Sequence, residues 1–106
     1  MTMFQERERA FEQMFVHDAE LQFRALARRN KLLARWAAEQ LGLEGREADD
    51  YVRQAIEAVT DPDADVPRRL ATDLGAVSSY WTEARLRQVT AEFMTKAVTE
   101  VRSEAH

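Results

Sequence analysis

The stretch from Phe4 to Leu41 contains no proline or glycine and is rich in the strongest helix-forming residues, but its hydrophobic pattern changes along its length. Up to residue 16 the large apolar residues are sparse and form one narrow helical stripe. From residue 23 the stripe widens to the i, i+3, i+4, i+7 spacing of a helix packed in a core. That wider stripe comprises Phe23, Leu26, Ala27, Asn30, Leu33, Ala34, Ala37 and Leu41. The pattern predicts one helical segment that begins outside a domain and ends inside it.

Three more helices are predicted after this segment, giving helices at about 19–41, 46–60, 66–74 and 80–103. Gly42 and Gly75 favour helix ends, because glycine readily adopts the left-handed conformation that follows a helix. Asp65 and Ser79 are suitable N-cap residues for the third and fourth helices, and Pro67 is tolerated in a first helical turn. No segment alternates with the period of two that a strand requires. We therefore expect an all-α, four-helix bundle-like domain without a sheet.

Each later helix carries its own apolar stripe. The second has Ala48, Tyr51, Val52, Ala55, Ile56 and Val59; the third has Leu70 and Leu74; the fourth has Trp81, Leu86, Val89, Phe93, Ala97 and Val101, flanked by Met94 and Val98.

The domain is expected to span 19–106, with 1–18 as a mobile helical arm, since an isolated helix of that length is marginal in water. The alternative is that the arm folds back and covers the bundle.

Composition narrows the function classes. The 106 residues include no cysteine, which excludes disulfides and thiolate metal sites. The net charge of −4 argues against nucleic-acid binding. No apolar run reaches the length of a membrane span, and the N-terminus lacks the pattern of a secretory signal, so a cytoplasmic protein without membrane insertion is expected.

Sites for catalysis or a metal find little support in the sequence. The acidic segment 61–65 begins like a calcium loop, but Val66 and Thr72 occupy the positions that need glycine and glutamate, so a capped linker is expected. His17 and Glu20 could share an ion, yet a catalytic metal needs about three protein ligands. No nucleophile–base grouping or phosphate-binding glycine loop is present. We predict no enzyme activity, no metal and no resident cofactor.

A basic stripe lies on the first core helix, where four cations follow the i, i+4, i+7, i+11 spacing: Arg24, Arg28, Lys31 and Arg35. It is interpreted as a solvated face neutralised by the acidic second helix. The alternative is a face that binds nucleotide or another anion weakly.

Asn30, inside the apolar stripe, is expected to be a structural residue, with contact in a surface groove as the alternative. Large aromatic residues near the predicted helix ends are expected to pack in or at the edge of the core: Trp36, Tyr80 and Trp81.

The arm carries the sharpest signal. Phe4, Phe11, Met14 and Phe15 stand at helical spacing among charged residues. A helix that docks into a groove of a partner has this composition, with apolar anchors and charged edges. The expected partner-binding residues are Phe4, Glu6, Arg7, Glu8, Arg9, Phe11, Glu12, Met14 and Phe15.

Several ordered segments carry a resemblance to a known family: RERAFE (7–12), HDAELQF (17–23), ARRNKLL (27–33), WAAE (36–39) and LGL (41–43). They resemble the zeta subunit family, inhibitors of the F1-ATPase of alphaproteobacterial ATP synthase. The chain departs from the family's pattern at Met14, Val16 and Arg35.

The resemblance implies that the arm inserts into a catalytic interface between the alpha and beta subunits of F1 and meets the gamma subunit of the rotating central stalk. It implies a regulatory protein held peripherally on the F1 sector at the inner membrane, and nucleotide binding by some members. The alternatives are a nucleotide-binding subunit and an assembly subunit that does not inhibit.

Overall fold

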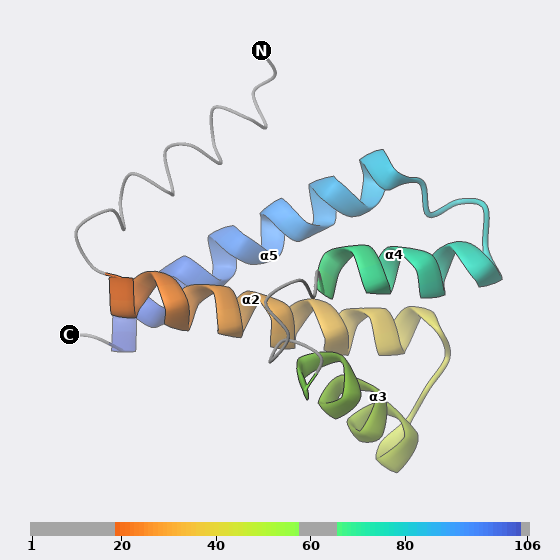
Figure 1. Cartoon of the computed structure of the whole chain (residues 1–106), viewed down its shortest axis with the longest axis horizontal. Helices are drawn as coiled ribbons and strands as arrows, with labels where there is room; N and C mark the ends of the chain where they lie inside the picture. The colour runs from red at the N-terminus through yellow and green to blue at the C-terminus, as the bar shows by residue number, and fades with distance from the viewer. Residues whose placement is uncertain (1–18, 58–65, 105–106) are drawn as a thin grey trace.

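A computed structural model describes residues 19–57 and 66–104 of the chain (Figure 1). Within these ranges the chain forms four α-helices and no strand: α2 (Ala19–Gln40), α3 (Gly45–Glu57), α4 (Val66–Val77) and α5 (Glu83–Glu104). The all-α prediction is therefore confirmed. None of these helices combines the length and hydrophobicity needed to cross a membrane.

Helix α2 is the central element, because each of the other three helices packs against it. Figure 1 shows α3 and α4 lying along the second half of α2, whereas the end of α5 crosses its first half. The C-terminal end of α5 thus lies beside the start of α2. This arrangement makes the two halves of α2 face different neighbours.

The buried residues of the described ranges form two separate clusters. The main core joins α2, α3, α4 and the beginning of α5 through Leu33, Ala34, Ala37, Ala38, Val52, Ala55, Val66, Leu70, Leu74 and Leu86. The second cluster joins the first half of α2 to the end of α5 through Ala25, Val98 and Val101, with Leu21 and Met94 packed against them. Most apolar positions predicted for the third and fourth helices are buried or packed on these clusters.

The predicted stop at Gly42 is confirmed. Gly42 has a φ of 77°, its N–H donates to the carbonyl of Glu39 at 3.0 Å, and the N–H of Leu43 donates to that of Ala38 at 2.9 Å. This pair of bonds closes a helix end that requires a left-handed residue, which glycine adopts without a steric penalty. Gly45 also has a positive φ, of 58°, and lets the chain turn into α3.

Two predicted helix boundaries are wrong. Gly75 does not end α4, which continues to Val77, because glycine permits a left-handed stop without enforcing one. Ser79 does not cap α5. The helix begins at Glu83, and the hydroxyl of Thr82 accepts a hydrogen bond from the backbone N–H of Arg85 at 3.2 Å.

The predicted core stripe of the first helix is correct from Asn30 onward and wrong at Phe23 and Ala27, whereas Leu26 is half-buried. Phe23 is 71% exposed and Ala27 is exposed, whereas Ala25, on another face, is buried. The reason is that the main core begins at the level of Asn30 and Leu33, and the first half of α2 packs on α5 instead. The predicted cap at Asp65, the linker 61–65 and the end of the second helix beyond residue 57 lie outside the described residues.

Candidate partner interface

The start of α2 is held against the end of α5 by charged as well as apolar contacts. The Arg28 guanidinium donates to Glu100 at 2.8 Å and also to Glu104, and Arg24 donates to Glu104 at 3.2 Å. The hydrogen bond that it accepts from Arg28 lowers the pKa of the Glu104 carboxyl, and donating to Glu104 and Glu100 raises the pKa of Arg28. These pairs border the second cluster, so both charged and apolar contacts hold the start of α2 on α5.

The basic stripe is thereby divided. Arg24 and Arg28 are neutralised by α5, not by the acidic second helix that the sequence suggested. Lys31 and Arg35 are exposed, and neither pairs with a carboxylate in the part of the chain that the structure describes. Two of the four cations are thus paired within the chain, and weak nucleotide or anion binding by this face stays a prediction.

Asn30 sits where the two clusters of α2 meet. It is 8% exposed, and its Oδ1 accepts hydrogen bonds from Arg29 Nε at 3.1 Å and Arg29 Nη2 at 2.8 Å. A buried amide oxygen needs such partners, since an unsatisfied one would cost about 1–3 kcal/mol. Its burial fits the predicted structural role, and it does not line the open groove between α4 and α5.

The predicted aromatic residues fall into two groups. Trp36 and Trp81 pack edge to face with ring centroids 4.8 Å apart, and Phe93 adjoins Trp36 at 6.3 Å. Tyr80 is mostly exposed at the turn before α5, with the Arg85 guanidinium 4.4 Å from its ring centre. Edge packing therefore holds for the two tryptophans. Tyr80 is not in the core, but its ring contacts that of Trp81 edge to face at 4.9 Å.

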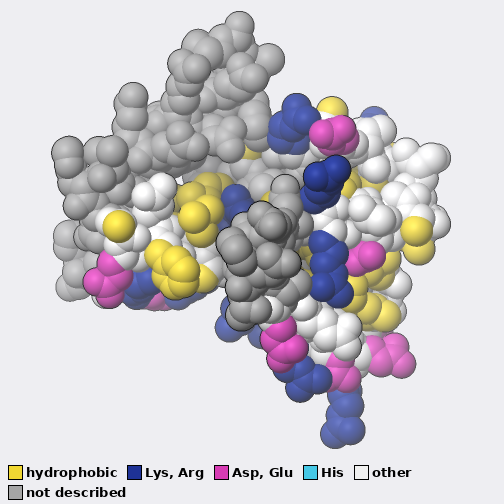
Figure 2. Space-filling view, in the orientation of Figure 1, with side chains coloured by type: hydrophobic (Ala, Val, Ile, Leu, Met, Phe, Trp, Pro, Cys, Tyr) yellow, Lys and Arg dark blue, Asp and Glu magenta, His cyan; other side chains and the backbone are white. Residues whose placement is uncertain are grey.

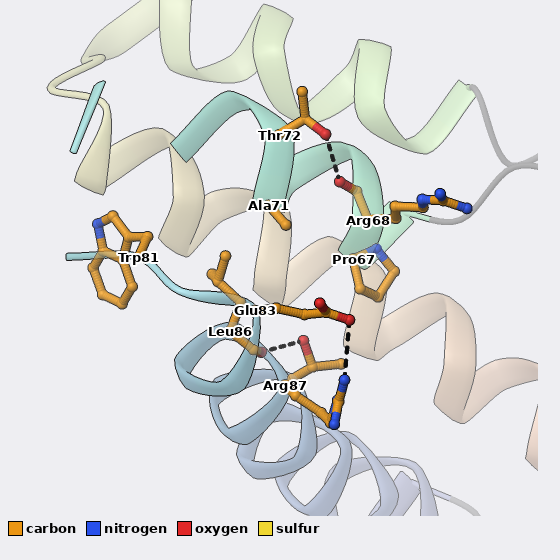
Figure 3. A pocket seen from close by; sticks show the side chains of 9 residues that line it. Pro67, Arg68, Ala71, Thr72, Trp81, Glu83, Leu86 and Arg87 are labelled. Carbon is orange, nitrogen blue, oxygen red and sulfur yellow. Dashed lines mark hydrogen bonds and ion pairs between the residues drawn. The ribbon is translucent and has the colours of Figure 1, made fainter. Parts of the chain in front are cut away.

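An open groove of about 610 Å³ lies between α4 and the first turns of α5 (Figure 3). Its polar groups are already engaged. Thr72 donates to the carbonyl of Arg68 at 3.2 Å, and Thr90 donates to that of Leu86 at 2.7 Å. Glu83 accepts from Arg87, one turn later on α5, at 3.0 Å. Because these hydroxyls and the arginine already have partners within the chain, few polar groups remain to bind a small ligand. The groove is therefore not our candidate site.

No group of three or more metal-binding side chains occurs among residues 19–57 and 66–104. Glu20 is exposed at the start of α2, while its proposed companion His17 and the acidic segment 61–65 lie outside the described residues. The same holds for all nine partner-binding residues predicted between Phe4 and Phe15. The predicted partner-binding segment is therefore not part of what the structure describes.

Sequence reasoning assigned Phe23 to the core and thereby missed the largest exposed side chain near the arm. The lengths of the helices could have indicated that Phe23 is exposed. The second and third helices have 13 and 12 residues and α2 has 22, so two short helices stacked along one end cannot cover its whole face. Hydrophobic periodicity reports which face is apolar, but not how far a neighbour extends along it.

The family of ATPase inhibitor subunit zeta has a model that matches residues 1–100. The chain belongs to this family. No curated protein and no solved structure matches it. The match spans the N-terminal segment and all but the end of the helical domain, so the zeta-type resemblance of residues 7–43 extends over nearly the whole chain. Members of this family are inhibitor subunits rather than catalysts, and the family implies contact with the F1 sector of the ATP synthase.

Proposed function

We propose that this chain inhibits ATP hydrolysis by F1 by inserting residues 1–18 into a catalytic alpha/beta interface, where they meet the gamma subunit of the central stalk. The observation that carries the proposal is the family match, which includes the arm as well as the domain. A body wedged between subunits that must open and close during rotation blocks turnover sterically, so no catalytic residue is needed.

The energetics of such an arm depend on its apolar anchors. Full burial of Phe4, Phe11 and Phe15 would stabilise the complex by roughly 1.5–3 kcal/mol each. Part of this gain offsets the conformational entropy that the arm loses on binding. The charged residues between the anchors would set register and orientation against the walls of the cleft.

The described helices supply the second half of the mechanism. Arg24 and Arg28 hold the start of α2 on α5, in a body whose principal extents are 39, 32 and 25 Å. A body of this size is far wider than a single helix of about 10–12 Å, and it limits how deep the arm can enter. We infer that the domain holds the arm and sets its reach while it stays peripheral on F1.

The deciding experiment measures ATP hydrolysis by F1 of the source organism, freed of its own zeta subunit, with three proteins. Full-length chain should inhibit, a chain lacking 1–17 should not, and a full-length F11A/F15A variant should inhibit much more weakly. The point variant keeps the chain length and so separates lost anchors from lost length. The exposed V77A variant, far from the arm, serves as the matched control and should inhibit like the unchanged chain.

A different result would replace the proposal. If full-length protein binds F1 without inhibiting it, the chain is an assembly subunit whose arm lacks potency. If the truncated chain inhibits as well as the full one, inhibition comes from the helical domain and the arm mechanism is wrong.

A further inference from the structure

An apolar face of α2 continues past the end of the bundle. Phe23 lies seven residues before Asn30 and eleven before Ala34, spacings of two and three helical turns that place all three on one face. Asn30 and Ala34 are buried in the domain, while Phe23 is 71% exposed and Ala27, one turn after it, is exposed too. Figure 2 shows hydrophobic side chains at the surface over the first half of α2 and the adjoining part of α5.

The charges beside this uncovered face are mainly positive. Lys31 and Arg35 follow Phe23 by eight and twelve residues, are exposed, and pair with no carboxylate of the described ranges. Glu20 is the exposed acid one turn before Phe23. An aromatic anchor with cations on its flank fits an apolar patch bordered by carboxylates, because such a surface complements both the ring and the charges.

The connectivity of the chain identifies which partner can reach this face. Phe23 is five residues beyond the arm's last residue, 18, so the two are at most about 18 Å apart even along extended chain. Arg24 and Arg28 pair with glutamates of α5, so the start of α2 is held beside the helical domain. Any surface that takes up the arm to residue 18 therefore lies next to Phe23.

From these observations we propose a second docking surface, formed by Phe23 and Ala27 with Lys31 and Arg35 on its flank. It contacts the rim of the same F1 cleft that receives the arm, at an apolar patch edged by acidic residues. This inference rests on the proposed function and deepens it. The arm blocks rotation of F1, and the face of α2 slows dissociation of the inhibitor from F1 by adding contacts outside the cleft.

The test compares F23A with V77A in the full-length chain. Both remove a mostly exposed apolar side chain, at 71% and 63% exposure, but Val77 lies at the end of α4 and outside the proposed surface. The concentration that half-inhibits F1 should rise about tenfold for F23A, the effect of losing one interface anchor, and stay unchanged for V77A. K31E should weaken inhibition severalfold, more at low than at high salt. Circular dichroism should show an unchanged fold for all three.

Three outcomes would overturn the inference. If F23A inhibits like the unchanged chain while F11A/F15A fails, the arm mechanism stands and the α2 surface is wrong. If F23A converts a dimer to a monomer in sedimentation, a second copy occupies the face. If F23A shifts NMR signals of residues 1–18 in the free chain, the arm itself covers it. A full-length chain that does not inhibit at all would instead remove the proposed function.

Discussion

The two halves of α2 differ in what surrounds them. From Asn30 to Gln40 the helix is enclosed by three neighbours, and its small residues Ala34, Ala37 and Ala38 let those neighbours approach closely. From Ala19 to Arg29 its buried contacts among the described residues are with the end of α5, through Ala25 and the ion pairs with Glu100 and Glu104. One continuous helix is therefore a core element at one end and a surface element at the other.

This difference separates two tasks. Burial on several sides supplies most of the stabilisation of a small domain, roughly 25 cal/mol per Å² of apolar surface removed from water. A half-covered helix leaves side chains free to contact a partner, at the cost of weaker local stability. In the proposed inhibitor the enclosed half holds the fold, and the half nearest the arm presents Phe23.

The largest expected effect comes from opening the main core at Leu33, which is fully buried on the enclosed half. L33A should lower the free energy of unfolding by about 2–5 kcal/mol, because it removes buried methyl groups and leaves a cavity. Urea denaturation followed by circular dichroism measures this. L33M, which nearly conserves volume, is the control and should cost less than about 1.5 kcal/mol.

Val101 tests the second cluster in the same way. V101A should cost about 1–2 kcal/mol, less than L33A, since fewer methyl groups leave a smaller cluster. Hydrogen exchange should accelerate most at residues 21–28, because the half-covered part of α2 opens locally. Equal acceleration at 33–38 would mean that the two halves unfold together and would contradict the comparison.

Tyr51 tests a polar tie on the enclosed side, where its hydroxyl donates to Asp73 at 2.7 Å and joins α3 to α4. Y51F should cost about 1 kcal/mol, the usual net value of a hydrogen bond. Burial, and next the bond to Asp73, raise the pKa of Tyr51 above its ordinary value of 10.0. The hydroxyl's contribution is therefore complete below pH 10 and is lost as the pH rises above it.

A pH series of denaturation curves checks this assignment. The stability difference between the unchanged chain and Y51F should shrink between about pH 10 and 11, where unfolded tyrosine ionises. The mostly exposed Tyr80 gives the control variant Y80F, which should lower stability less than Y51F at neutral pH. A constant difference across this range would show that the hydroxyl of Tyr51 is not held in the folded chain.

The smallest expected effect is at Glu104, whose ion pairs with Arg24 and Arg28 are partly exposed. E104Q should lower the melting temperature only slightly, because Arg28 keeps Glu100 and solvent screens the pair. The pKa of Glu104 lies below its ordinary value of 4.5, so this stabilisation is present above that pH and is lost as the pH falls further. The exposed E92Q on α5 is the control, and a larger loss there would contradict the assignment.

Much of the secondary structure of this protein could be predicted from the sequence alone. Four helices, their apolar faces and the stop at Gly42 were all predictable, because propensity, 3.6-residue periodicity and a positive φ act within a few residues. The predictions that were wrong concerned residues of equal local propensity. Ser79 and Thr82 are both suitable N-caps, and Gly75 can either end a helix or lie within one.

Only the tertiary structure decided what each face of α2 meets. Arg28 pairs with glutamates 72 and 76 residues away, and the nearer acidic helix is not its partner. Phe23 belongs to an apolar stripe by sequence yet is exposed, because α3 and α4 cover only the other end of the helix. Periodicity fixes the direction in which a side chain points, whereas the extent of the neighbouring helices fixes whether anything is there to bury it.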